Sequence, residues 1–243
     1  MRYLLTFCLF ISSFNSFADI YDSLYEKAGW PQQQAHFASA VKHTQLRYQD
    51  TLPNVIYQAL VENSNQRFAI EAMHQRGQKA LRQQLDNPTS ALEFFESTTG
   101  RKVVAAEIAA SHPEQLNHYA AGLPLIHAEA TRRLLIRHLS QILPASQAGA
   151  DVSLALGSVA ADSLSQMLPG LMSTEQTKAL LNTQRQRLIN EIDTHIDNTL
   201  LHIYRNLSDA ELEEFVNFAQ SNAGQAYYQA ALKTLQASLG EET

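Results

Sequence analysis

The sequence predicts an all-α fold, arranged as a multi-helix bundle or array that is built from two related helical halves. Alanine, leucine and glutamine are abundant, whereas the 9 glycines and 7 prolines among 243 residues fall where helices would end. Alternating runs of β-branched residues are nearly absent, and apolar residues recur at helical spacing. This composition and this period favour helices over strands along the whole chain.

Residues 1–18 are typical of a secretory signal peptide. Arg2 provides the positive charge, an apolar stretch follows, and Ser16-Phe17-Ala18 is a small-x-small cleavage site. We expect cleavage after Ala18 and a periplasmic location, with an uncleaved N-terminal anchor as the alternative. Cleavage would remove Cys8, the only cysteine, so the mature chain would contain neither a disulfide nor a thiol nucleophile.

An N-terminal half is expected over residues 19–143. Gly29 ends the first predicted helix, Pro53 opens the third, and Pro88 occupies the first helical position of the fifth. Gly100 separates that helix from one that carries Val103 and Ile108. Apart from the helix after Gly100, the predicted helices of this half span residues 19–29, 32–50, 53–63, 65–85, 88–97, 113–121 and 124–143. In the last of them we expect four residues to face inward: Ile126, Ala130, Leu134 and Leu139.

A C-terminal half is expected over residues 144–243, either as a second small domain or as part of one compact domain. Residues 145–168 are rich in Ala, Ser and Gly, which is compatible with a linker, but Val152 and Val159 keep a helical period and favour a closely packed helix. Ser173 opens a capping box and a long helix to about residue 206. Ser208 and Glu211 form a second capping box, which begins the next helix.

One segment recurs in both halves with the spacing Phe-x-x-Ser-x-x-Gly. It predicts a helix-to-helix joint, in which Phe is a core anchor, Ser bonds to free backbone groups, and Gly permits close approach of the backbone. The residues of the first copy are Phe94, Ser97 and Gly100, and those of the second are Phe218, Ser221 and Gly224. Amphipathic helices precede and Ala-rich helices follow each copy, so we interpret the halves as an internal repeat.

Residues 206–225 read NLSDAELEEFVNFAQSNAGQ and resemble the signature of the DUF2059 family. The similarity is clear over about 175–238 and weaker in the first half. The family usually has an aromatic residue where this chain has Ala219, and often a proline where it has Asn222. The resemblance implies a small, exported, helical protein of a Gram-negative bacterium with unknown function, and it transfers no catalytic residue.

Among the nine histidines, the most suggestive arrangement is a polar helix face with Glu191, His195, Asn198 and His202. Glu191 and His195 are weak candidate metal ligands, since an i,i+4 pair can hold one ion only if further ligands come from elsewhere. No HExxH, Gly-x-Ser-x-Gly or phosphate-binding loop motif is present. We therefore predict no catalytic residue, no bound metal and no cofactor.

Arg132, Arg133 and Arg137 are predicted to form a small basic patch, which is either a solvated face or a contact for anionic lipid headgroups or another acidic envelope component. The aromatic residues Tyr21, Tyr25, Trp30, Phe37 and Tyr48 either belong to the core or line an apolar groove. The chain carries 24 acidic and 18 basic residues, a balance that disfavours nucleic-acid binding. No later segment reaches the length of a membrane span.

These observations favour a non-catalytic periplasmic binding module for an envelope partner, a peptide or a lipid, with a groove between the halves as its site. Two other classes are kept as alternatives. One is a metal-dependent or hydrolytic enzyme, and the other is a structural or holdase-type envelope component. The sequence does not predict the ligand, the oligomeric state or the biological process.

Overall fold

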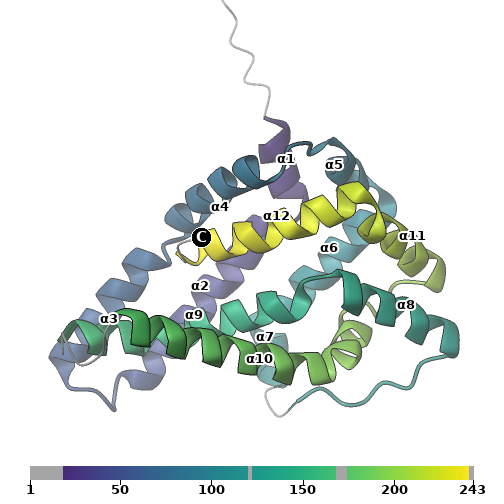
Figure 1. Cartoon of the computed structure of the whole chain (residues 1–243). Coiled ribbons are helices and arrows are strands. Elements are labelled where there is room, and N and C mark those ends of the chain that lie inside the picture. The colour runs from purple at the N-terminus through teal and green to yellow at the C-terminus, as the bar shows by residue number, and fades with distance from the viewer. Residues whose placement is uncertain (1–18, 120–121, 168–173, 241–243) are drawn as a thin grey trace, which may run out of the picture.

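The computed structural model describes residues 19–119, 122–167 and 174–240, and every regular element in them is an α-helix (Figure 1). This confirms the predicted all-α class. In chain order the helices are α1 (Ile20–Lys27), α2 (Trp30–Tyr48), α3 (Asn54–Arg67), α4 (Ile70–Gln84), α5 (Thr89–Glu96), α6 (Thr98–Ser111), α7 (Pro113–His118), α8 (Ala130–Ile142), α9 (Ala145–Met167), α10 (Thr174–Ile203), α11 (Asp209–Gln220) and α12 (Asn222–Ser238). The signal region, the break at Pro169 and the cap at Ser173 lie outside the described residues.

The sharp turn between α1 and α2 depends on Gly29. This residue has a φ of 78°, in the left-handed region that favours glycine, and it ends α1 as the sequence predicts. Helix α2 begins at Trp30, earlier than the predicted start at 32, because Pro31 is tolerated in the first turn of a helix. Pro88 also differs from prediction, since it is the N-cap of α5 and the helix proper begins at Thr89.

Helix α8 begins at Ala130, so the predicted helix over 124–143 is too long by its first turns. The preceding segment is held by side chains of α10 instead. Asn198 accepts a hydrogen bond from the Ile126 N–H at 3.0 Å and donates one to the Pro124 carbonyl at 3.1 Å. His202 Nε2 donates to the same carbonyl at 2.6 Å. These bonds satisfy backbone groups that a helix would otherwise pair internally.

The predicted inward face of α8 is partly wrong. Leu139 is buried as expected, but the side chain of Leu134 is 64% exposed and Ala130 is also exposed. Ile136 is buried in place of Leu134. Ile136 and Leu139 are three positions apart and lie on one face of the helix, whereas Leu134 projects elsewhere.

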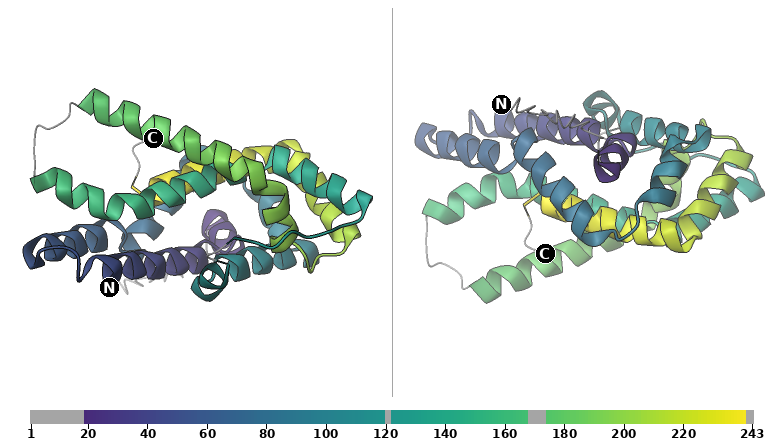
Figure 2. Two further views of the ribbon diagram at one scale, coloured as in Figure 1. Left: turned by 90° about the horizontal axis from the view of Figure 1, so that it is seen from below. Right: turned by 90° about the horizontal axis from the view of Figure 1, so that it is seen from above.

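Helix α9 confirms that residues 145–167 form a packed helix and not a linker. Ala150, Asp151 and Ala155 are buried, and α9 packs against α10, α3 and α2, an arrangement that Figure 2 shows from two sides. A Cβ added at Gly149 would lie 3.1 Å from Cδ1 of Ile192, so this small residue allows α10 to approach closely. Asp151 also accepts two hydrogen bonds from Arg185 of α10, at 2.5 and 3.1 Å.

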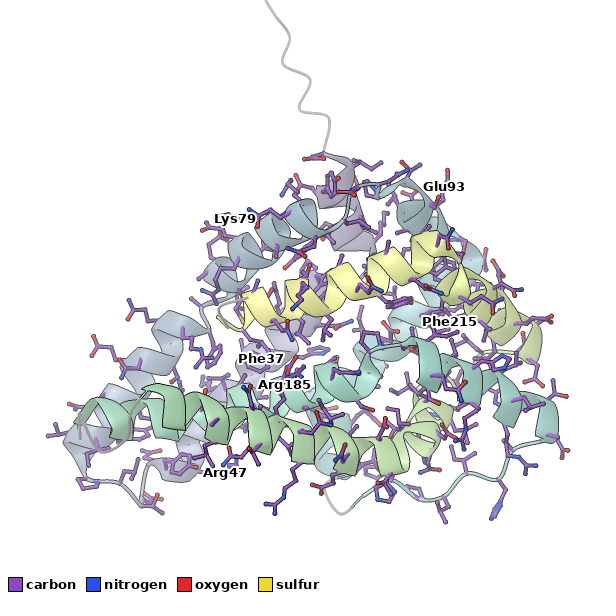
Figure 3. The ribbon with its side chains drawn as sticks, viewed as in Figure 1. Phe37, Arg47, Lys79, Glu93, Arg185 and Phe215 are labelled. Atoms are coloured by element: carbon purple, nitrogen blue, oxygen red, sulfur yellow. The ribbon has the colours of Figure 1, made fainter. Side chains whose placement is uncertain are left out.

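Among the described residues, two hydrophobic clusters hold the helices together, and each combines residues from both predicted halves. The larger one contains Phe215 and the smaller one lies against Phe37, both of which are labelled in Figure 3. The two halves therefore pack against each other rather than forming two separate cores. Within the described residues, no helix is both long and apolar enough to cross a lipid bilayer.

Helix α12 runs through the middle of the molecule, with α4 along one side and α9, α5 and α11 also in contact (Figure 1). Two arginines satisfy the carbonyl groups at its C-terminal end. Arg76 donates to the carbonyls of Ala237 and Ser238, at 3.0 and 2.6 Å, and Arg67 donates to that of Leu239 at 3.0 Å. Cations at this end also interact favourably with the helix dipole.

Candidate functional site

The segments 94–100 and 218–224, which we call the first and second junctions, have the same local geometry. At the first, Ser97 is the N-cap of α6, and its hydroxyl accepts a hydrogen bond from the Gly100 N–H at 2.9 Å. At the second, Ser221 is the N-cap of α12 and accepts from the Gly224 N–H at 3.1 Å. Each glycine lies in the first turn of its helix rather than between helices, which corrects the expected role of Gly100.

Glycine is required at both positions because the backbone of the preceding helix lies very close to the glycine Cα. A Cβ at Gly100 would lie 1.9 Å from the carbonyl oxygen of Phe94, and one at Gly224 would lie 2.0 Å from that of Phe218. These same two carbonyls accept a hydrogen bond from the Ser97 and Ser221 N–H groups, each at 3.0 Å. Any side chain larger than hydrogen would therefore push the two helices apart.

The two junctions also contact each other. The Phe94 and Phe218 rings stack face to face, with centroids 4.0 Å apart and planes 6° from parallel. Thr99 of α6 donates a hydrogen bond to Glu214 of α11 at 2.5 Å, and Lys102 forms an ion pair with Glu211. That ion pair lowers the pKa of Glu211, as do its hydrogen bonds with Ser208 in the capping box that begins α11. These contacts join the two junctions directly and have a structural role.

The three arginines of α8 do not form the predicted basic patch. Arg132 points into the molecule, where it pairs with Asp209 at 2.7 Å and donates to the carbonyls of Tyr204 and Leu207 at 2.8 and 2.9 Å. It thereby stabilises the turn between α10 and α11. Arg137 pairs with Asp197 of α10 at 2.6 Å. Only Arg133 has no acidic partner in the part of the chain that the structure describes.

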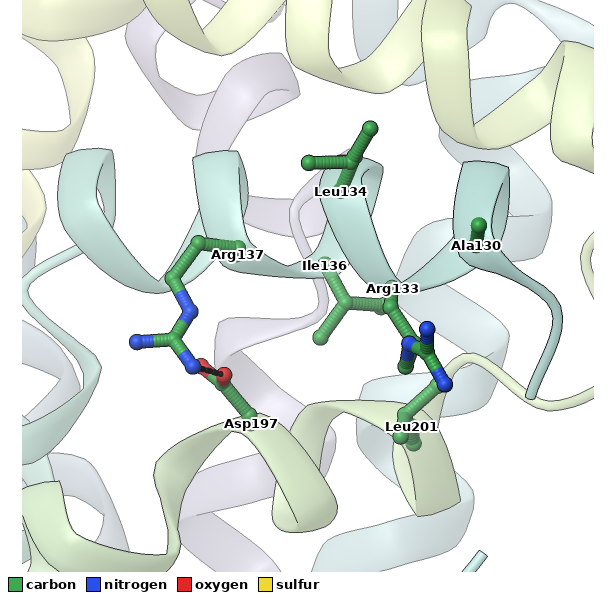
Figure 4. Close-up of a pocket in the computed structure, with 7 residues that line it drawn as sticks. All are labelled: Ala130, Arg133, Leu134, Ile136, Arg137, Asp197 and Leu201. Carbon is green, nitrogen blue, oxygen red and sulfur yellow. Dashed lines mark ion pairs between the residues drawn. The ribbon is translucent and has the colours of Figure 1, made fainter. Parts of the chain in front are cut away.

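Arg133 and Arg137 instead border a groove between α8 and α10, which we call the arginine groove (Figure 4). Both side chains extend from α8 towards α10, one on each side of Ile136. The groove has a volume of about 380 Å³ and a lining that is mostly apolar. It is defined by Ala130, Arg133, Leu134, Ile136, Arg137, Asp197 and Leu201.

A polar depression continues from the arginine groove on the other side of the Arg137–Asp197 ion pair. It has a volume of about 420 Å³ and is lined by residues of α8, α9 and α10. Ser146 of α9 donates a hydrogen bond to Asp193 of α10 there, at 2.7 Å. One ion pair thus separates an apolar space that contains Arg133 from a polar space that contains Asp193.

The predicted metal candidates Glu191 and His195 are both exposed on α10. The structure brings no third ligand to them, since none of the described His, Cys, Asp and Glu residues gather into a group of three or more that could hold a metal ion. The other two residues of this polar face, Asn198 and His202, bind the backbone of the segment before α8. The face therefore has a structural role over half of its length.

A third cavity, the aromatic cleft, lies between α2, α4, α9 and α12, with α7 beside it. Its volume is about 150 Å³ and its walls are largely apolar. The principal residues that line it are Trp30, Gln34, Phe37, Met73, Leu156 and Leu235. Three of the aromatic residues considered from the sequence belong to this region. Trp30 and Phe37 line the cleft, and Tyr25 stacks on Trp30 with the ring centroids 5.6 Å apart.

Sequence reasoning missed Glu107, the single acidic residue in the apolar run 103–110 of α6. The Tyr204 hydroxyl donates a hydrogen bond to it at 2.7 Å, and no basic side chain pairs with it among the described residues. Burial raises the pKa of Glu107 to about 7, although the bond from Tyr204 acts in the opposite direction. The carboxyl group also acts on Tyr227 and Tyr228 of α12 and raises their pKa values further than burial alone.

Comparison with known proteins identifies no relative of this chain. No family model, no curated protein and no solved structure matches the chain.

Proposed function

We propose that this chain is a periplasmic, non-catalytic binding protein whose arginine groove takes an anionic amphiphile of the cell envelope. The observation that carries the proposal is an apolar floor flanked by two guanidinium groups, those of Arg133 and Arg137. A ligand with one acidic headgroup and one hydrocarbon chain has the matching arrangement of charge and apolar surface.

The charges of the groove favour an anion at one place in particular. Asp197 neutralises Arg137, so that arginine is held in place and contributes little net charge. Arg133 is exposed and has no acidic partner in the described structure, which leaves its planar guanidinium free to bind a carboxylate or phosphate. This is a local positive site on a chain with a formal net charge of −6.

The apolar part of the ligand would cover the exposed side chain of Leu134, while Ile136 and Leu201, which also line the groove, are already buried. Leu134 is 64% exposed, which is unusual for a leucine in a helix that packs on both α10 and α11. Covering such a surface is favourable in proportion to the apolar area removed from water. The groove lies between α8 and α10, one helix from each predicted half, which is the place where a ligand is expected from the sequence.

The proposed location depends on the signal-like residues 1–18 and on the resemblance of residues 206–225 to the DUF2059 family. We also infer that the two halves arose by duplication of one helical unit. The support for this inference is the shared geometry of the two junctions, down to the position of the serine cap and the clash that a Cβ would cause at each glycine.

The test measures binding of two amphiphiles with the same chain, dodecyl phosphate and dodecylphosphocholine, by titration calorimetry below their micelle concentrations. We expect saturable binding of the anionic probe and at least about tenfold weaker binding of the zwitterionic one, the factor expected for loss of a charge-assisted contact. Arg133→Gln should weaken binding of dodecyl phosphate by a similar factor, while Arg187→Gln, an exposed arginine elsewhere on α10, should not.

Two results would contradict the proposal. One is the absence of saturable binding of dodecyl phosphate. The other is an equal affinity of the chain and of Arg133→Gln, which would place any bound amphiphile outside the arginine groove. Preferential binding of an acidic peptide over dodecyl phosphate would replace the lipid with a protein partner.

A further inference from the structure

Two residues that line the aromatic cleft carry a buried polar atom without a hydrogen-bond partner among the described residues, Trp30 at Nε1 and Gln34 at Oε1. Gln34 of α2 lines the cleft and is only 5% exposed. Its Nε2 donates to the Tyr25 hydroxyl at 2.7 Å and to the Ser238 hydroxyl at 3.3 Å. Its Oε1 is buried and has no hydrogen-bond partner among the described residues. Buried amide oxygens are nearly always paired, so an unpaired one on a residue that lines a cavity indicates a missing donor.

The surroundings of Gln34 hold its amide in place. Tyr25 and Ser238 occupy the space above Gly77 of α4, where a Cβ would lie 2.4 Å from the tyrosine hydroxyl and 2.5 Å from the serine hydroxyl. Tyr25 also packs edge-on against His74, with centroids 5.0 Å apart. Because the nitrogen side of the amide is engaged by these two hydroxyls, the oxygen is the atom left for a partner.

The size and lining of the cleft limit what that partner can be. An apolar cavity of about 150 Å³ is large enough for a benzene-sized molecule. Phe37, Met73 and Leu156 offer carbon surfaces, which bind an aromatic ring better than they bind water. Met73 is unbranched and can adapt to a ring that enters. Leu116 of α7, which is 54% exposed, also lines the cleft and marks its open side.

We propose that the aromatic cleft is a second binding site, for a one-ring aromatic molecule that carries a single hydrogen-bond donor, such as a simple phenol. The ring occupies the apolar space between α2 and α9, and the hydroxyl group donates its hydrogen to Oε1 of Gln34. This site is separate from the arginine groove, shares no residue with it and does not depend on the function proposed for that groove.

Trp30 makes the test direct, because it is the only tryptophan of the chain and lines the cleft. Its fluorescence, excited where phenols do not absorb, is followed during titration of the purified chain with para-cresol. The matched probe is para-fluorotoluene, which has nearly the same shape but no hydrogen-bond donor. We expect saturable binding of para-cresol with one site per chain and about fivefold weaker binding of para-fluorotoluene, the factor that one neutral hydrogen bond contributes.

Ala40 of α2 lines the cleft, so Ala40→Leu should fill it and weaken binding of para-cresol by at least about tenfold, through steric exclusion. Ala35→Leu adds the same atoms to an exposed position of the same helix and should have no effect. If Ala40→Leu does not fold by circular dichroism, Leu156→Phe fills the same space from α9.

Three results would overturn the proposal. The first is a linear, unsaturable change in Trp30 fluorescence, and the second is unchanged binding in a folded cleft-filling variant. The third is equal affinity for para-cresol and para-fluorotoluene, which would remove Gln34 from the site and with it the assigned ligand class. Arg133→Gln should leave para-cresol binding unaltered, so failure at this site and failure at the arginine groove are distinguishable.

Discussion

The first and second junctions share a backbone geometry, yet the side chains packed around them differ in a complementary way. In the first, Ala91 and Phe95 occupy the positions that Phe215 and Ala219 occupy in the second. All four are buried, so each junction has one large and one small residue, in exchanged places. The comparison teaches that the serine and glycine determine the path of the chain, while the bulk around them can be redistributed.

The helices that leave the junctions differ more strongly. Helix α6 carries Glu107 after the first junction, whereas α12 has Ala231 at the aligned position after the second. Conversely, α12 has Tyr227 and Tyr228 where α6 has Val103 and Val104. The carboxyl group of Glu107 on α6 therefore acts on Tyr227 and Tyr228 of α12.

The largest effects should come from the junction glycines. Gly100→Ala and Gly224→Ala each place a Cβ within 2.0 Å of a main-chain oxygen that cannot move alone. We expect each to lower the free energy of unfolding by about 4 kcal/mol or more, at the upper end of the range for single substitutions. Urea denaturation followed by circular dichroism measures this loss.

The control is Gly157→Ala, because no atom lies within 4 Å of the Cβ that it adds to α9. A helical Gly→Ala change in open space should be neutral or stabilise by about 0.5–1 kcal/mol. If only one of the two junction glycines is sensitive, the junctions are not equivalent, and the inferred duplication loses its main support.

The next largest losses of stability should come from substitution of the stacked phenylalanines. Phe94 is buried and Phe218 is half-buried, so Phe94→Ala should cost about 3–4 kcal/mol and Phe218→Ala about 2 kcal/mol, in the order of their burial. The double variant should cost about 1 kcal/mol less than the sum of the two losses, since the ring–ring contact can be lost only once. Equal losses from the two single variants, or strict additivity, would contradict this account.

Glu107 provides a pH-dependent difference between the halves. The pKa of Glu107 is raised from its ordinary value of 4.5 to about 7 in the folded state. The contribution of this group to stability is therefore largest below pH 4.5 and is lost as the pH rises through about 7. Glu107→Gln, which stays neutral, should be more stable than the parent chain at pH 8 by roughly 2–3 kcal/mol and nearly equal to it at pH 4.

Thermal or urea unfolding at several pH values measures this difference. Glu93→Gln is the control, because Glu93 is exposed on α5, and its removal should leave the pH profile of stability unchanged. A pH profile of Glu107→Gln that coincides with that of the parent chain would show that the carboxyl group is ionised in the folded protein without penalty.

The serine caps should show the smallest effects. Ser97→Ala and Ser221→Ala each remove one N-cap hydrogen bond, with an expected cost of about 1 kcal/mol. Ser221 should be the more sensitive, because its hydroxyl also donates to the Phe218 carbonyl at 2.6 Å. Threonine at either position retains the capping oxygen and should restore most of the loss, whereas equal losses with Ala and Thr would exclude capping as the cause.

The sequence predicted the features that depend on residues close together in the chain. The Ser208–Glu211 capping box, the helix end at Gly29 and the helix over 145–167 all follow from local rules. The features that were missed depend on partners far apart in sequence. Arg132 bonds to groups more than 70 positions away, and Gln34 bonds to Ser238, 204 positions away, so neither role has a local signature.

The candidate sites illustrate the same limit. Arg133 and Arg137 were singled out as basic residues, but the apolar floor between them comes partly from Leu201 of α10. Trp30 and Phe37 were considered for a groove, but the unpaired oxygen of Gln34 was not predicted, because pairing depends on the whole fold. The helical start predicted at 124 was wrong for a related reason. Asn198 and His202, far along the chain, hold that segment in a non-helical path.

The central position of α12 has a consequence for how the chain acquires its structure. This helix follows all the other described helices in sequence, yet α4, α5, α9 and α11 all pack on it. The earlier helices therefore cannot complete their core before residues 222–238 have been synthesised. Contacts between residues far apart in sequence, such as those between α12 and α4, slow folding. A nascent chain of this protein should therefore stay incompletely folded until its last described helix has been synthesised.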